Sequence, residues 1–112
     1  MSTHEQTSSA ATFELGRVFT SNGVFTAANA SSELAAFLRT ILGRHKTRDW
    51  GDVTQEDRDA NHAALEEGSR LLSSYNFTFE VEGPFGPTKG GRLWIITEAD
   101  RSVTTVLFPE EY

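Results

Sequence analysis

Imidazole and carboxylate side chains gather in the middle of the sequence, where they could bind a divalent cation or exchange protons with a substrate. The set comprises His45, Asp49, Asp52, Glu56, Asp57 and His62. Their spacing matches no metal-binding signature, and the helix dipole alone explains acids in the first turn of a helix. Structural, solvated roles are therefore the preferred interpretation, and an acid–imidazole site around His45 and Asp49 stays an alternative.

A second polar cluster lies between two apolar runs near the C-terminal end and contains Glu98, Asp100 and Arg101. A site at a sheet edge is one interpretation of these three residues. The pattern is also typical of a turn in which Asp100 accepts hydrogen bonds from main-chain N–H groups and Arg101 pairs locally. We favour the turn, because the segment is short and polar.

A third cluster is basic and follows an apolar, helix-like segment: Arg39, Arg44, Lys46 and Arg48. Such side chains could contact nucleic acid or an acidic partner. No aromatic residues are interleaved with them, as base stacking would require. Cations also suit the carbonyl end of a helix, and we expect a solvated helix end.

Residues 83–91 are rich in glycine and proline and predict a loop. They lack the Walker pattern and a strand–turn–helix setting, so a phosphate-binding loop is not expected. Phe85 at the tip is either an exposed anchor for a partner or a side chain folded back on the sheet.

The composition predicts a folded domain with an acidic surface. Of 112 residues, 38% are hydrophobic and 11% aromatic, enough for a true core. Cysteine is absent, which excludes disulfides and thiolate metal sites. The net charge of −6 disfavours non-specific binding to nucleic acid, favours a partner with a basic surface, and also serves solubility.

No apolar run approaches the roughly 20 residues that span a bilayer. Residues 1–12 are polar, and we expect a disordered tail rather than a signal peptide. The remaining residues, 13–112, are expected to form one domain in the cytoplasm.

The first half of that domain contains a strand signal and a helix signal. Residues 13–19 and 24–26 flank Asn22-Gly23, a pair that predicts a β-hairpin turn. A helix is expected to begin after Ser31 or Ser32 and to end near Gly43. Its apolar residues recur with helical spacing at Leu34, Phe37, Leu38, Ile41 and Leu42.

A second helix is predicted over residues 55–67, capped by Thr54 and ended by Gly68. Residues 71–82 alternate with period two and predict a half-buried strand. Two further strands are expected at 93–97 and 103–108, the last ended by Pro109. The fold class is therefore α+β, an antiparallel sheet in the order β(β)-α-α-β-β-β with two helices packed on one face.

One series of residues resembles a large group of small uncharacterised proteins from plasmids, phages and integrative elements. The series includes Asp49-Trp50-Gly51-Asp52-Val53, Arg70-Leu71-Leu72-Ser73-x-Tyr75 and the run from Leu93 to Tyr112. The resemblance covers roughly residues 16–112 and implies no reaction and no catalytic residues. It implies a setting in which small accessory proteins, such as anti-CRISPR and anti-restriction inhibitors, block host defences.

The leading hypothesis is a non-enzymatic binding protein that blocks a basic, nucleic-acid-binding site of a CRISPR-Cas or restriction complex. No cofactor or metal is expected, and the protein would act as a monomer or homodimer. The alternatives are a small enzyme using His45 and Asp49, and a toxin–antitoxin or regulatory component. The predicted partner contacts are Asp49, Asp52, Glu56, Asp57, Asp59, Glu66, Glu67 and Phe85.

Overall fold

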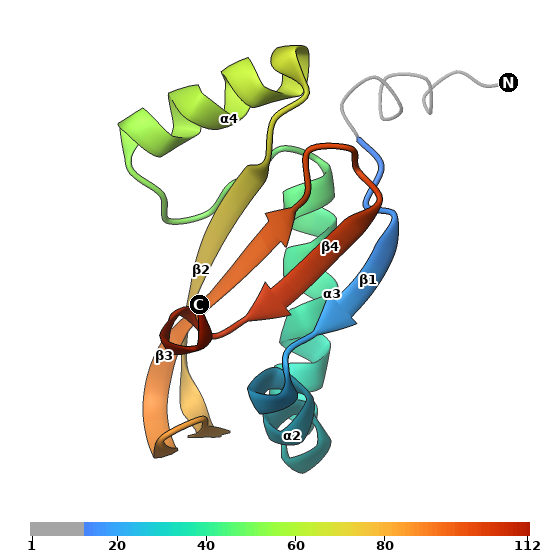
Figure 1. Cartoon of the computed structure of the whole chain (residues 1–112). Coiled ribbons are helices and arrows are strands. Elements are labelled where there is room, and N and C mark those ends of the chain that lie inside the picture. The colour runs from blue at the N-terminus through green and yellow to red at the C-terminus, as the bar shows by residue number, and fades with distance from the viewer. Residues whose placement is uncertain (1–12) are drawn as a thin grey trace, which may run out of the picture.

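The computed structural model describes residues 13–112, which form an α+β fold (Figure 1). The predicted tail, residues 1–12, lies outside the described part. The strands and helices follow one another as β1 (Arg17–Thr20), α2 (Asn22–Ala30), α3 (Ser32–Lys46), α4 (Gln55–Glu67), β2 (Leu71–Gly83), β3 (Gly86–Thr97), β4 (Val103–Leu107) and the short 3-10 helix η1 (Pro109–Glu111).

The strands make one sheet in the order β1-β4-β3-β2. β2, β3 and β4 form the predicted antiparallel meander, in which Leu72 pairs with Ile96 and Ile96 with Thr105. β1 joins the far edge parallel to β4, so that Phe19 lies beside Thr105. The sheet is therefore mixed, because its first strand runs parallel to the last one.

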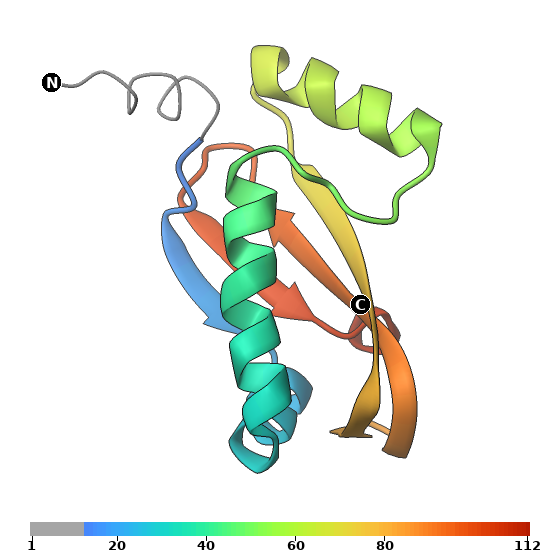
Figure 2. The same ribbon diagram turned by 180° about the vertical axis from the view of Figure 1, so that it is seen from behind.

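Two helices cover one face of this sheet. Figure 2 shows α3 running across that face, with α2 beside its first turn. Between helices and sheet lies the main core, to which α2, α3, β2, β3, β4 and the residue after β4 contribute buried side chains. Its buried members are Val24, Ala27, Leu34, Ile41, Tyr75, Phe77, Val81, Leu93, Ile95, Val106 and Phe108.

The predicted starts of α3 and α4 and the predicted end of α4 are confirmed, whereas α3 continues past the predicted end at Gly43 to Lys46. The Ser31 hydroxyl accepts the Leu34 N–H at 3.1 Å at the start of α3. The Thr54 hydroxyl accepts the Asp57 N–H at 3.1 Å at the start of α4. Gly68 ends α4 in the left-handed conformation, with φ of 78°.

The predicted hairpin at Asn22-Gly23 is wrong, since these residues open helix α2. A type I′ turn needs positive φ at both positions, and neither residue has it here. The Ser21 hydroxyl caps the helix by accepting the Val24 N–H at 3.2 Å. The Glu111 carboxylate, from the far end of the domain, accepts the Gly23 N–H at 3.0 Å. Tertiary contacts thus override the local hairpin signal.

The predicted loop at residues 83–91 is also wrong. β2 and β3 continue as a long hairpin to Gly83 and Gly86, leaving only Pro84 and Phe85 as the connection. The register shifts between Phe77 and Glu80, which marks a β-bulge. The glycines and Pro87 therefore belong to the paired arms of the hairpin, and Pro84 to its turn.

Candidate functional site

His45, the imidazole of the predicted acid–base site, lies in the last turn of α3 and is fully buried against the sheet. Its Nδ1 lies 2.5 Å from the Ser73 hydroxyl and its Nε2 lies 2.9 Å from the Thr97 hydroxyl. Thr97 in turn contacts Thr104 at 2.7 Å, and the Thr104 hydroxyl donates to the Leu15 carbonyl at 2.7 Å. A chain of hydrogen bonds therefore holds the imidazole against β2 and β3, through Ser73 and Thr97.

The direction of the protons in this chain follows from its last bond. The Thr104 hydroxyl donates its only proton to the Leu15 carbonyl, so its oxygen accepts a hydrogen bond from the Thr97 hydroxyl. Thr97 therefore accepts from Nε2–H of His45, and Nδ1 accepts from Ser73. The network defines a neutral imidazole with its proton on Nε2. Burial, helped by the positive charge of Arg101, lowers the pKa of His45 to about 4.

Asp49, the predicted partner of His45, pairs elsewhere. Its carboxylate accepts from Nε of Arg44 at 2.6 Å and from the other arm of the same guanidinium at 3.2 Å. This hydrogen bond lowers the pKa of Asp49. Asp52 is exposed on the following bend. His45, Asp49 and Asp52 do not converge, so the acid–imidazole site that the sequence offers as an alternative is not assembled.

The main chain around Asp49 is instead part of the scaffold. Its carbonyl accepts the hydroxyl of Tyr75 at 2.6 Å, while the Arg44 guanidinium lies 4.8 Å from the centre of the Tyr75 ring. Burial raises the pKa of this tyrosine, which stays a neutral donor. Gly51 then runs beside β2 and pairs with Ser74. The segment after α3 is thus fastened along the outer edge of the sheet.

Helix α4 carries most of the predicted partner contacts. It is attached to the sheet through a small second core of Trp50, Ala64 and Leu71. The Asn61 side chain bonds both main-chain groups of Leu72, donating to the carbonyl at 2.7 Å and accepting the N–H at 3.1 Å. Figure 1 shows α4 standing apart from α2 and α3, beyond one end of the sheet.

The exposed side of α4 is acidic. Within this helix five acids face solvent, against one arginine, Arg58. Asp59 accepts from the Gln55 side chain at 2.9 Å, while Asp52 and Asp49 extend the acidic surface toward α3. The five helix acids, which we call the α4 acids, are Glu56, Asp57, Asp59, Glu66 and Glu67. Among residues 13–112, no group of three or more metal-binding side chains is close enough to hold an ion.

The polar turn after β3 has the structural role that the sequence suggests. The Asp100 carboxylate accepts the N–H of Ser102 at 3.0 Å and its hydroxyl at 2.6 Å. Arg101, held at φ of 62°, donates to nearby carbonyls of the turn and also reaches across to the Ser69 carbonyl at 2.6 Å and the Ala64 carbonyl at 3.1 Å. The turn therefore ties α4 to the sheet.

The four basic residues at the end of α3 have different surroundings. Arg44 is engaged with Asp49, and Arg48 has a left-handed backbone with φ of 70° in the turn that leaves the helix. Arg39 and Lys46 are exposed. The charge of Arg44 is therefore already paired with a carboxylate, which leaves it less available to an outside partner.

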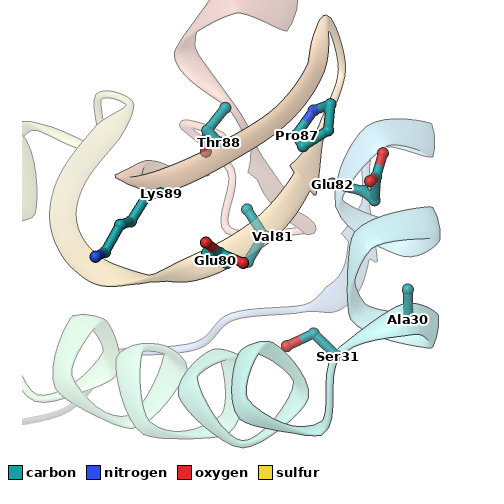
Figure 3. A pocket seen from close by; sticks show the side chains of 8 residues that line it. All are labelled: Ala30, Ser31, Glu80, Val81, Glu82, Pro87, Thr88 and Lys89. Atoms are coloured by element: carbon teal, nitrogen blue, oxygen red, sulfur yellow. The ribbon is translucent and has the colours of Figure 1, made fainter.

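Phe85 lies at the hairpin tip and is 81% exposed, so it is not folded back on the sheet. Figure 3 shows a hollow beneath this hairpin, between its two strands and the junction of α2 with α3. The hollow measures about 350 Å³ and is lined by Ser31, Glu80 and Lys89 among others. It is open, and its lining carries both acidic and basic side chains.

The sheet face opposite α3 carries residues that the sequence did not single out. Trp94 and Tyr112 meet edge to face with ring centres 5.6 Å apart. The Arg70 guanidinium donates to the Tyr112 hydroxyl at 2.7 Å. With Leu72 and Ile96, these side chains line a recess of about 170 Å³. The even-numbered residues of the predicted strands indicate which side chains share this face, but not their contacts with Arg70 and Tyr112.

Comparisons with protein-family models, with curated proteins and with solved structures find no match for this chain. Within residues 13–112, no helix has the length and apolar character needed to cross a membrane.

Proposed function

We propose that the protein is a non-enzymatic inhibitor from a mobile genetic element, which docks an acidic surface onto the basic, nucleic-acid-binding site of a host defence complex. A CRISPR-Cas or restriction complex is the class of partner implied by the resemblance of the sequence to plasmid and phage proteins. The observation that carries the proposal is the set of five exposed acids on α4, a helix set apart from the main core.

Two physical arguments support this function. A cationic channel that binds phosphates also attracts a dense row of carboxylates, and long-range attraction speeds the encounter. The α4 acids are also held on a rigid element, because Asn61 and the second core fix the helix to β2. Rigid presentation limits the conformational entropy that is lost on binding. Asp49 and Asp52, on the segment that leads into α4, remain flanking contacts in this proposal. Phe85 lies beyond the far end of β2 from α4 and would make a separate contact with the partner.

The direct experiment is a phage or plasmid challenge of cells that carry one defined defence system, with and without this gene. Inhibition should raise the number of transformants or plaques on the defended strain and leave an undefended strain unchanged. The purified protein should also bind the purified defence complex, with an affinity that falls as salt is added. An absence of any effect across the main CRISPR-Cas and restriction types would contradict the proposal.

A matched pair of variants tests the role of α4. In the first, all five α4 acids are replaced by their amides, which changes the net charge from −6 to −1. The control makes the same charge change at five exposed acids elsewhere: Glu14, Glu33, Glu80, Glu82 and Glu110. We expect the first variant to lose inhibition and the control to keep it. Equal loss in both would show that only total charge matters.

A further inference from the structure

The sheet face opposite α3 forms a surface of its own, which Figure 1 shows from the front. The register places Phe19, Thr105, Ile96 and Leu72 in one row across the four strands. These side chains point away from α3, since their neighbours along each strand belong to the helix side. Ile96 is 5% exposed but lies outside the main core. We call this surface the open face.

Three aromatic side chains border the apolar centre of the open face. Phe19 is 45% exposed and Tyr112 67% exposed, while Trp94 is partly buried and packs edge to face against Tyr112. The recess beside Trp94 and Tyr112 has an apolar floor of Leu72 and Ile96. Its volume of about 170 Å³ and its two ring walls, inclined to each other at 68°, suit one flat aromatic ring.

Three exposed arginines surround these rings. Arg17 lies 5.4 Å from the centre of the Phe19 ring, and Arg70 lies 5.7 Å from that of Tyr112. Arg92 bonds the Asn76 side chain at 3.1 Å near the other end of the face. The strand spacing puts Arg17 and Arg70 three strands apart, about 14 Å, at opposite edges. Each guanidinium has further N–H groups that can bind a phosphate.

We propose that the open face binds single-stranded RNA, with bases on Phe19, Trp94 and Tyr112 and phosphates on Arg17, Arg70 and Arg92. Aromatic rings on a sheet, with cations at its margins, provide both stacking and charge neutralisation for a flexible strand. Rings favour bases over an acidic peptide, which would use only the arginines. The Thr105 hydroxyl, at the centre of the face, can bond a ribose 2′-hydroxyl, which favours RNA over DNA.

Most acids lie away from the open face, so the net charge of the whole chain does not oppose this inference. The α4 acids lie on the separate helix, and Glu80 and Glu82 lie beyond the β-bulge toward the hairpin tip. Near the face, Glu111 is engaged by three hydrogen-bond donors, Glu110 is exposed in η1 before Tyr112, and Glu98, directly after β3, lies in the row of Arg70. Glu98 should weaken RNA binding by repulsion, so Glu98→Gln should raise the affinity.

The experiment measures the fluorescence anisotropy of a labelled oligouridine 12-mer titrated with the full chain. We expect binding that weakens with salt, with a log–log slope of about −2 for three phosphate contacts on a single strand. The variant Arg17→Gln/Arg70→Gln/Arg92→Gln should lose at least about tenfold in affinity and flatten the salt slope. Phe19→Ala and Tyr112→Ala should each lose at least about fivefold, with the slope unchanged.

Matched controls replace the same residue types on other surfaces. Phe25, 60% exposed on α2, is the aromatic control for Phe19, and Arg39 on α3 is the control for the arginines. Phe25→Ala and Arg39→Gln should leave RNA affinity within about twofold, since neither lies on the open face. Amide substitution of the α4 acids should not weaken RNA binding, so the two binding functions can fail separately.

Several outcomes would overturn the inference. One is no anisotropy change at about 100 μM protein, the weak end of non-specific binding. Another is binding that the open-face variants do not reduce. Tighter binding of oligothymidine DNA than of oligouridine would refute the choice of RNA. Binding of a polyglutamate peptide with equal affinity and equal sensitivity to Phe19→Ala would refute the assignment to bases.

Discussion

Acidification should destabilise the protein through His45, between neutral pH and about pH 4. In the unfolded chain this imidazole titrates near 6.5, whereas burial lowers its pKa in the folded state to about 4. The unfolded state therefore binds the proton first. The stability that the neutral imidazole contributes is complete above pH 6.5 and is lost as the pH falls toward 4.

The magnitude follows from the two pKa values. A difference of about 2.5 pH units at 1.36 kcal/mol each amounts to about 3 kcal/mol in total, of which about 2 kcal/mol is lost by pH 5. The side chain is fully buried, so solvent does not screen this effect. Protonation would also place a new N–H at Nδ1 of His45, where it would face the hydroxyl proton that Ser73 donates to this nitrogen.

The assay is urea unfolding at a series of pH values from 7.5 to 5, for the wild type and His45→Gln. The pKa of Asp49 and of Asp100 is also lowered, but the stability these acids contribute is lost mainly below that range. We expect the wild type to lose about 2 kcal/mol across the range and His45→Gln, which starts less stable, to lose far less. His62→Gln, at an exposed site on α4, is the matched control and should follow the wild type. Parallel curves for the wild type and His45→Gln, or an NMR titration midpoint for His45 near 6.5, would refute this reasoning.

Four further substitutions, one of them a control, test the scaffold by their effect on the free energy of unfolding. Gly51→Ala should cost at least about 2 kcal/mol, because φ is 74° and a Cβ would lie 2.1 Å from a main-chain oxygen of β2; Gly43→Ala, in open space on α3, should instead stabilise by up to about 1 kcal/mol in the same denaturation assay. Asn61→Ala should cost about 1–3 kcal/mol and speed hydrogen exchange in α4, since it leaves both main-chain groups of Leu72 without that partner; exchange that is unchanged would contradict the anchoring role. Glu111→Gln should cost about 1–3 kcal/mol, because the carboxylate accepts three hydrogen bonds, and α2 should become more susceptible to proteolysis; equal digestion of the two proteins would count against this clamp.

Local signals were sufficient for α3 and α4. Their caps, Ser31 and Thr54, act on N–H groups three residues away, and the apolar spacing of α3 is set by the helix period alone. The antiparallel meander also follows from short connections between apolar runs. Each of these elements is determined by residues close together in the chain.

The two wrongly predicted segments have different causes. Asn22-Gly23 has a strong hairpin signal, yet Glu111, 88 positions from Gly23, helps to hold this pair in a helix. The glycine-rich arm of β3 is extended because the adjoining end of β2 pairs with it, and glycine and proline are residues that strands usually lack. A long-range partner decided the first case, and pairing between neighbouring strand ends decided the second.

The candidate sites divide in the same way. The α4 acids could be located from the sequence because they lie in a helix whose cap and end the sequence predicts. The open face could not, since Arg17 and Phe19 join Trp94 and Tyr112 only through the parallel pairing of β1 with β4. The burial of His45 was equally hidden, because Ser73 and Thr97 come from two other strands.

The parallel pairing of β1 with β4 also constrains when the protein can fold during synthesis. Arg17 pairs with Val103, so β1 emerges from the ribosome 86 residues before its partner strand. At about 5–20 residues per second, that interval is about 4–17 s. The β2–β3 hairpin can close as soon as it is made, whereas β1 and its exposed Val18 and Phe19 must wait. Nascent chains therefore pass through a stage in which an apolar edge is open to chaperones.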